Sequence, residues 1–354
     1  MQIVSTLKRF VPRPLRPPLR KCYRLLCPNS AYALRTQNEI ETFNAIEQVH
    51  DLPAISHYWS EKYIVPLLTP YGFRNSIECF RTYIAQMCAK RGSDGILILS
   101  VGAGDAATEI NMAEWLREKG ISNYHFECLD LNAGVLSRGR ASAEAKGLIE
   151  HFTFAPFDIN SWKPSRSYDV VLAIQSLHHF VQLELLFDKI LNVLAPDGYF
   201  MSDDMIGRNG HQRWPEALKF VHALWQELPE KNKYNHALKR VEKEYENWDC
   251  STVGFEGIRA QDILSLLVKR FNFELFIAFG NVIDIFVDRG FGPNFDPADE
   301  NDRAFIDRVQ ALDQAEIESG HIKPTHMIAV MTKVKVGETK MYKHLSPQFC
   351  IRRA

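Results

Sequence analysis

The sequence lacks the features that mark a secreted or a membrane-spanning protein. Its seven cysteines are scattered and odd in number, without the closely spaced pairs that bind zinc, so neither a disulfide framework nor a zinc cluster is expected. No apolar run approaches the roughly 18 residues that cross a bilayer, and residues 1–10 lack the apolar stretch of a signal peptide. We therefore expect a cytoplasmic protein with no transmembrane segment.

An excess of charge of one sign is also missing. The chain has 42 Lys and Arg against 43 Asp and Glu, and this balance does not predict nucleic acid as a partner. Residues 1–27 are the exception, with seven basic residues, four prolines and no acid. Because dense proline prevents a continuous helix, this arm is either a flexible, solubilising extension or a weak peripheral contact with an anionic lipid, partner or substrate. The oligomeric state is not indicated.

The sequence does contain enough apolar residues, 46% of 354, for one large core or a core with an accessory region. Apolar spacing is helical before residue 93, and from there short apolar runs alternate with amphipathic helices, which is typical of a parallel sheet wrapped by helices. The expected organisation is a basic, proline-rich extension (1–35), a helical preface (36–92), an α/β domain (93–335) with a largely helical insertion at about 204–258, and a tail (336–354).

A glycine loop follows the first apolar run of the α/β domain. Residues 96–101 read as a strand, Gly102-Ala103-Gly104 follows, and a helical pattern begins near residue 107. Glycines at this place let a ligand approach the backbone, and the helix amides that follow favour negative groups. The spacing Gly102-x-Gly104-x-x-Ala107 also satisfies the dinucleotide fingerprint, so the loop alone leaves the ligand open.

Polar residues end the next three expected strands. Asp130 follows residues 124–129, and its two carboxylate oxygens can accept both hydroxyls of a ribose. Phe157-Asp158 follows the third strand and could flank and hydrogen-bond an adenine. The fourth strand, 168–174, opens into Gln175-Ser176 and then Leu177-His178-His179. These strand ends are expected to meet at one crevice.

Together these motifs resemble the class I S-adenosylmethionine-dependent methyltransferases, particularly the small-molecule branch whose strand-four motif ends in Leu-His-His. The resemblance covers residues 94–203 motif by motif, and residues 255–275 and 327–331 look like the family's late helix, sixth strand and antiparallel seventh strand. It implies an α/β fold with a Rossmann-like, seven-stranded, mostly parallel sheet. It also implies S-adenosyl-L-methionine as the cofactor and methyl transfer as the activity.

The resemblance assigns cofactor contacts to particular residues. Those implied are Gly102 and Gly104 (with Ala103 between them) at the methionine portion, Asp130 at the ribose, Leu131 and Phe157 near the adenine, Asp158 at the adenine amino group, and Gln175 (beside Ser176) near the methionine ammonium. Two positions depart from the family pattern. Ser100 stands where an acidic residue is usual, and Ala106 stands where a third glycine is usual.

The acceptor is expected on the same sheet edge. His178 and His179 are candidate bases for removing a proton from a hydroxyl, with His211 as a weaker candidate; the alternative is that these imidazoles are structural. Aromatic and basic residues of the insertion, among them Arg213, His236 and Arg240, suggest a lid over a small-molecule or saccharide-like acceptor. Asp203-Asp204 has no evident third ligand, so no metal is expected.

Two other functions are considered. A nicotinamide-dependent dehydrogenase fits the glycine spacing, but the order of late elements and the Leu177-His178-His179 motif favour methyl transfer. An inactive methyltransferase fold serving as a binding module would fit Ser100 and the basic arm. The presence of Asp130 and Asp158 argues against it, because a module without cofactor has no need of them.

Overall fold

A computed structural model describes residues 28–45, 51–159, 162, 164, 166–252, 254–335 and 337–352. The expected basic arm at 1–27, with Cys22 and Cys27, lies outside the described residues. Within the described ranges, no helix has both the length and the apolar character needed to cross a membrane.

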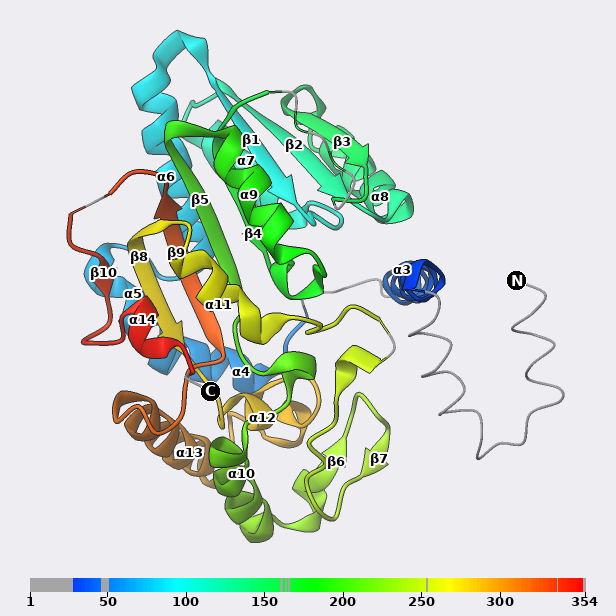
Figure 1. The fold of residues 1–354 in the computed structure, drawn as a ribbon. Coiled ribbons are helices and arrows are strands. Elements are labelled where there is room, and N and C mark those ends of the chain that lie inside the picture. The colour runs from blue at the N-terminus through cyan, green and yellow to red at the C-terminus, as the bar shows by residue number, and fades with distance from the viewer. Residues whose placement is uncertain are drawn as a thin grey trace, which may run out of the picture.

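A large sheet forms the centre of the molecule, in the strand order β10-β8-β9-β5-β4-β1-β2-β3 (Figure 1). The strands are β1 (Ile96–Val101), β2 (Tyr124–Asp130), β3 (Phe152–Pro156), β4 (Tyr168–Ile174), β5 (Leu194–Met205), β8 (Asn272–Phe279), β9 (His326–Thr332) and β10 (Lys340–Met341). Strands β1 to β5 pair in parallel, whereas β9 is antiparallel to both β5 and β8. The expected mostly parallel α/β sheet is confirmed, and the two-residue β10 extends it at one edge.

The helices are α3 (Pro28–Ala45), α4 (Ala54–Trp59), α5 (Val65–Leu68), α6 (Ser76–Arg91), α7 (Ala107–Glu118), α8 (Ala133–Ala145), α9 (Leu183–Val193), α10 (Pro215–Glu227), α11 (Ala260–Val268), α12 (Asp284–Val287), α13 (Glu300–Glu318) and α14 (Pro347–Cys350). Helix α7 contacts α6 and α8, and these three helices lie along the half of the sheet formed by β1 to β3. Helix α11 contacts α9 and α14, and these three lie on the other face of the sheet, nearer the viewer in Figure 1. The expected extension at 1–35 overlaps α3, and the domain boundaries stay predictions.

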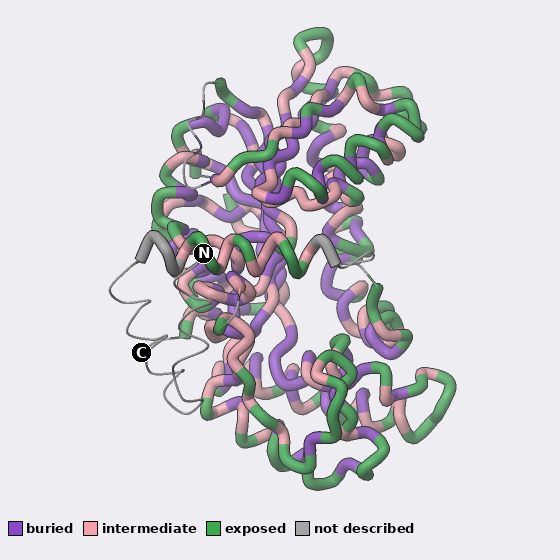
Figure 2. Tube along the Cα trace, turned by 90° about the vertical axis from the view of Figure 1, so that its right-hand side faces the viewer, coloured by how far each residue is buried: buried purple, intermediate pink, exposed green. Residues whose placement is uncertain are grey.

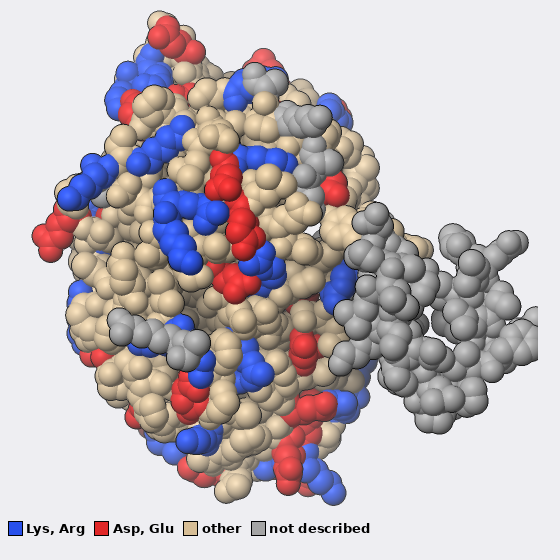
Figure 3. Space-filling model, viewed as in Figure 1, with Lys and Arg blue, Asp and Glu red and all other residues tan. Residues whose placement is uncertain are grey.

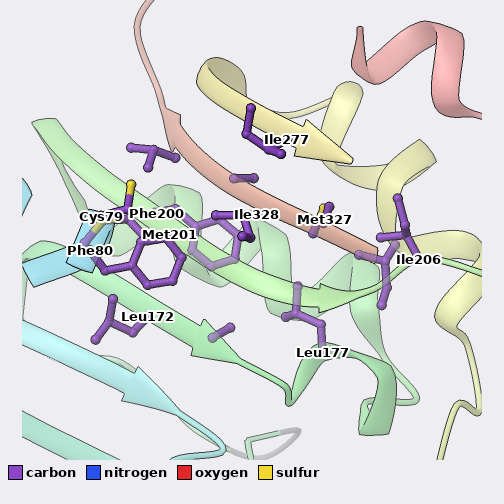
Figure 4. Close-up of a cluster of buried hydrophobic side chains, with 14 of the residues drawn as sticks. Cys79, Phe80, Leu172, Leu177, Phe200, Met201, Ile206, Ile277, Met327 and Ile328 are labelled. Atoms are coloured by element: carbon purple, nitrogen blue, oxygen red, sulfur yellow. The ribbon is translucent and has the colours of Figure 1, made fainter. Parts of the chain in front are cut away.

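The core lies between the sheet and these helices. Met201 of β5 pairs with Leu172 of β4, and Cys79 and Phe80 of α6 belong to the same buried cluster (Figure 4). Phe200 points to the opposite face of the sheet, where it packs against Phe187 of α9 and Phe271. Central strands read as continuous apolar runs because both of their faces are covered. At about 25 cal/mol per Å² of apolar surface removed from water, this burial provides the main stabilisation of the fold.

The sequence Ala195-Pro196-Asp197-Gly198 predicts a turn before the fifth strand, but the structure includes these residues in β5. Strand pairing jumps from Tyr168↔Leu194 to Val170↔Tyr199, so the four residues between Leu194 and Tyr199 bulge out within one continuous strand. Gly198 explains the close approach, since a Cβ there would lie 2.7 Å from the Asp169 carbonyl oxygen. A bulge of this kind bends the strand without ending it.

The insertion after β5 is helical in α10 and irregular beyond it. Val221 and Trp225 form the buried side of α10, as the spacing predicted, and Trp225 packs edge-on against Phe291 at a centroid distance of 4.8 Å. After Leu228 the chain makes a short antiparallel hairpin, β6 (Tyr234–Asn235) with β7 (Arg240–Val241). The helical expectation therefore holds for α10 and not for the segment that follows it.

Charged side chains of both signs alternate on the face shown in Figure 3. Across α9 and α11, Arg259 pairs with Glu184 at 2.6 Å and with Asp262 at 2.8 Å. Such interspersed pairs leave no extended basic field on this face of the kind that binds a phosphate backbone.

Candidate active site

The glycine loop between β1 and α7 is held tightly to both neighbouring strand ends. The backbone N–H groups of Gly102 and Ala103 both donate to the carbonyl of Leu129, at 2.8 and 3.0 Å. Gly102 has φ +70°, and a Cβ there would lie 2.7 Å from Cβ of Ser176. Gly104 also has a positive φ of +56°, but a Cβ there would meet only Cγ1 of Val135, at 4.0 Å. The first glycine is required by packing, and the second leaves room for a ligand.

Asp130 ends β2 and fixes the loop from the other side. Its Oδ2 accepts the N–H of Gly104 at 2.9 Å, and its Oδ1 accepts the N–H of Asn132 at 2.7 Å. Burial raises the pKa of the Asp130 carboxyl, and the two N–H donors partly oppose this effect. Each carboxylate oxygen has a further lone pair, so the group can still accept ribose hydroxyls.

The residues expected near the adenine gather beside Asp130. Leu131 is half-buried directly after β2, and the N–H of Phe157 donates to the Asp130 carbonyl at 2.8 Å. The Phe157 side chain is 42% exposed, so its ring can cover a ligand. Asp158 accepts a 3.1 Å hydrogen bond from the hydroxyl of Tyr32 on α3. The structure therefore brings the four expected positions to one edge of the sheet.

Ser100 has an unexpected acidic partner. Its side chain is buried and donates a 2.6 Å hydrogen bond to Oε1 of Glu109 on α7. Burial raises the pKa of Glu109 to about 7, although the Ser100 hydroxyl acts in the opposite direction. A buried carboxyl group from α7 thus lies next to Ser100, behind the loop.

The loop after β4 has one buried and one exposed member. Ser176 is buried, and its hydroxyl donates to the Val101 carbonyl at 2.8 Å, which ties β4 to the glycine loop. Gln175 is exposed with φ +49°, and its amide Nε2 donates to Asp203 at 3.0 Å. Asp203 in turn accepts the Ser76 hydroxyl at 2.5 Å. This arrangement leaves Gln175 exposed at the end of β4 and makes Ser176 a support of the glycine loop.

A cluster of three histidines and one glutamate lies beside this loop. We call it the histidine cluster: His178, His179, His211 and Glu256. Nδ1 of His178 donates to Asp204 at 2.7 Å, and Nδ1 of His179 donates to Glu39 of α3 at 2.6 Å. Nε2 of His178, His179 and His211 faces the Glu256 carboxylate at 3.4, 3.5 and 2.6 Å. Both expected base candidates and the weaker third are therefore in contact.

A known protein family matches about half of the chain. A family model described as a methyltransferase domain matches residues 93–272, which is 180 of the 354 residues. The chain belongs to the methyltransferase-domain family. This membership confirms the expected class I fold and the family whose cofactor is S-adenosylmethionine, and it replaces the dehydrogenase alternative.

Individual relatives of the methyltransferase are distant. It is 24% identical over 196 residues to a sterol 24-C-methyltransferase of Pneumocystis carinii, covering 54% of this chain and 48% of the relative. It is 26% identical to a fatty-acid O-methyltransferase of Mycolicibacterium smegmatis, covering 41% and 48%. A solved O-methyltransferase of a polyketide synthase multienzyme from Brevibacillus brevis, in complex with S-adenosyl-L-homocysteine, is 14% identical, with 82% and 85% covered and a TM-score of 0.43. The methyltransferase thus spans about half the length of the curated relatives it matches.

Electrostatics distinguish the histidines of the methyltransferase. Burial lowers the pKa of His178, but Asp204 and Glu256 outweigh this effect and raise it to about 10. For His211 burial dominates, and its pKa is lowered despite the hydrogen bond to Glu256. A ring that stays protonated at neutral pH is a poor base. The expected base role of His178 stays a prediction, which this raised pKa disfavours.

Helix α3 covers the site of the methyltransferase and was not expected there. It crosses the face turned to the viewer in Figure 2, and it contributes both Tyr32 at Asp158 and Glu39 at His179. Glu39 also accepts the N–H of Phe255 at 3.0 Å, and Arg35 donates to the carbonyls of Ser251 and Gly254. One helix thus contacts the cofactor side and the acceptor side.

The other insertion residues considered for the acceptor are engaged elsewhere. Arg213 is buried and donates to the Asn281 carbonyl at 2.9 Å and to Asp284 at 3.0 Å. Arg240 pairs with Glu242. His236 forms a 3.0 Å hydrogen bond with Asn294 and is not part of the histidine cluster. Of the insertion residues considered for the acceptor, only His211 reaches the histidine cluster.

Sequence patterns did not identify Glu39, Glu109, Glu256 or Gly139 as parts of the site. A Cβ at Gly139 of α8 would lie 2.4 Å from the carbonyl oxygen of Asp105, so α8 packs directly on the glycine loop. A glycine inside a helical pattern is a signal of close backbone approach, and it could have indicated this contact. The three glutamates have no local signal, because their partners come from other elements.

A hollow in the described structure lies away from these residues. Trp214, Gln261, Ser265, Lys323 and Arg352 contribute to its lining, and none of the expected site residues does. Arg352 covers one face of Trp214 at 4.2 Å from the ring centroid. The motif geometry, and not the depth of this hollow, identifies the site.

Proposed function

We propose that the protein transfers the methyl group of S-adenosylmethionine to a hydroxyl oxygen of a small organic molecule. The observation that carries the proposal is the position of the histidine cluster, which flanks the glycine loop through the Ser176 contact to Val101. Methyl transfer is an in-line displacement, and alignment of the acceptor is its largest requirement. Imidazole and carboxylate groups can hold a hydroxyl in that alignment.

The names of the relatives support a small acceptor. One is a fatty-acid O-methyltransferase and another a sterol 24-C-methyltransferase. The saccharide-like alternative depended on basic insertion residues, and Arg213 and Arg240 are paired within the protein. We therefore propose a hydroxyl-bearing small molecule and retain a saccharide only as one member of that class.

The test uses isotopically methyl-labelled S-adenosylmethionine with a panel of hydroxylated small molecules, read by mass spectrometry. We expect label on oxygen of at least one acceptor, and less label with the Asp130→Ala variant at a donor concentration near the wild-type Kd. Label only on carbon or nitrogen would overturn the oxygen assignment while keeping methyl transfer. A protein that binds the cofactor but labels nothing in a broad metabolite extract would favour the inactive binding module.

A further inference from the structure

We propose that His178, His211 and Glu256 form a binding site for one divalent transition-metal ion. One ligand atom from each of these residues lies within 4.8 Å of the others. Two imidazoles and one carboxylate are a set that zinc and iron(II) accept, and three protein ligands leave a coordination position open to a substrate. Metal binding itself does not depend on the proposed function.

The separations fit a shared ion. Two ligand atoms bound at about 2.0–2.1 Å in tetrahedral geometry lie roughly 3.3 Å apart, and Nε2 of His178 is 3.4 Å from Oε1 of Glu256. Nε2 of His211 is 2.6 Å from the same oxygen, so that contact would lengthen by about 0.7 Å. The Glu256 side chain is 41% exposed and has room to move.

The hydrogen bonds orient His178 as a ligand. Its Nδ1 donates to the buried carboxylate of Asp204, so Nε2 is the nitrogen that faces Glu256. A metal ion that displaces the proton from Nε2 would bind the lone pair of this atom. A lone pair facing a carboxylate is repelled unless positive charge lies between them. A carboxylate on the far nitrogen is also the usual support of a metal-binding imidazole.

His179 repeats this arrangement. Its Nδ1 donates to Glu39 at 2.6 Å, and its Nε2 lies 3.5 Å from Oε2 of Glu256. Three carboxylates, Glu39, Asp204 and Glu256, thus surround the imidazoles. Positive charge between them can come from protons on the rings or from one divalent ion, and the ion would also use the converging nitrogen atoms.

The backbone is shaped to bring His211 into the cluster. His211 has φ +54°, a left-handed conformation that costs a non-glycine residue energy and persists where the surroundings impose it. A Cβ at Gly257 would lie 3.0 Å from the Gly210 nitrogen and 3.1 Å from Cε1 of His211. Glycine at 257 therefore allows the two ends of the insertion to meet at His211 and Glu256.

This site differs from the metal pair weighed in the sequence. Asp203 accepts bonds from Ser76 and Gln175, and Asp204 accepts N–H groups of Ser176 and Leu177. Asp204 therefore supports His178 and is not itself a ligand. The role of the ion rests on the proposed function: it would polarise the acceptor hydroxyl and lower the pKa of that hydroxyl.

The test measures metal binding without donor or acceptor. Protein freed of metal by chelator dialysis is titrated with Zn²⁺ against a chromophoric chelator, and Co²⁺ then reports coordination by its visible absorption. We expect one Zn²⁺ per chain, with no displacement by a large excess of Mg²⁺, which prefers oxygen ligands. His211→Ala and Glu256→Gln should each raise the Kd for Zn²⁺ at least about tenfold.

The matched control is His321→Ala. His321 forms a surface pair with Glu316 at 2.7 Å, so this variant removes a histidine–carboxylate contact of similar length outside the cluster. It should leave the Kd unchanged, and circular dichroism should show that all variants are folded. If folded His211→Ala and Glu256→Gln bind Zn²⁺ as well as wild type, or if wild type binds none, protons supply the charge and the proposal is wrong. Zinc binding without methyl transfer would overturn only the proposed function.

Discussion

The hydroxyl of Ser100 donates a 2.6 Å hydrogen bond to the carboxyl group of Glu109, nine residues further along the chain and behind the glycine loop. Both side chains are buried. The pair connects the end of β1 to the first turn of α7. It therefore fixes the relative position of the two elements that flank the glycine loop.

This burial makes the stability of the protein depend on pH. Because the pKa of Glu109 is raised to about 7 from its ordinary 4.5, the folded protein binds this proton more tightly than the unfolded chain does. The contribution to the free energy of unfolding is therefore largest below the unfolded pKa and falls by roughly 3 kcal/mol as pH rises through the folded pKa. Glu109→Gln should remove that part of the slope in denaturant titrations between about pH 4.5 and pH 7, which are the unfolded and folded pKa values. Glu118→Gln, an exposed change on the same helix, should keep the wild-type slope; an equal slope for Glu109→Gln would refute the assignment.

Asp130→Ala should weaken cofactor binding. The substitution removes the carboxylate that accepts the Gly104 N–H and is placed to accept the ribose hydroxyls, so we expect a loss of about 1.5–3 kcal/mol in affinity. Calorimetry with S-adenosylhomocysteine measures it directly. Glu144→Ala, on the exposed side of α8, is the control. Unchanged affinity of a folded Asp130→Ala protein would show that the ribose binds elsewhere.

Alanine substitutions at the two glycines of the loop should affect different properties, stability at Gly102 and cofactor affinity at Gly104. At Gly102 a Cβ would lie 2.7 Å from Ser176 Cβ, so Gly102→Ala should lower the free energy of unfolding by more than the roughly 1–2 kcal/mol of left-handed strain alone. Gly104→Ala adds strain but no protein clash, and its methyl group would enter the expected ligand space. We expect it to reduce cofactor affinity more than stability, measured by denaturation and calorimetry. Equal effects of both changes would contradict the loop geometry.

Two truncations distinguish the contribution of the basic arm to cofactor binding from that of α3. Removing residues 1–27 should leave cofactor binding unchanged, because this arm precedes every cofactor motif. Removing residues 1–45 also deletes Tyr32 and Glu39, which contact Asp158 and His179. Stopped-flow measurements should then show faster association and faster dissociation of S-adenosylhomocysteine, because a cover over the edge is lost. Rates equal to those of the shorter truncation would show that α3 does not gate the site.

The cofactor half of the site was predictable because its residues are marked locally. Gly102, Asp130, Asp158 and Ser176 each follow an apolar run, and the carboxyl ends of parallel strands share one edge of the sheet. The positions of these residues in the structure therefore follow from strand order. Their individual roles toward the cofactor stay predictions.

The acceptor half was predicted only in part. His178 and His179 were marked by their motif, but Glu39 lies 140 residues from His179, and Glu256 lies 45 residues from His211. No periodicity relates such residues, since their contacts depend on how α3 and the insertion pack. The bulge at 195–198 was missed for a similar reason, because turn residues within a strand and turn residues at its end look alike in sequence.

The contact of His211 with Glu256 brings together the two ends of the chain segment between them, residues 212–255. Insertions into a segment whose ends already meet add little loop-closure entropy, so changes of length are tolerated in its less packed parts. Helix α10 is not such a part, because its buried side packs against Phe291 through Trp225. Variation in length is therefore expected at the hairpin of β6 and β7.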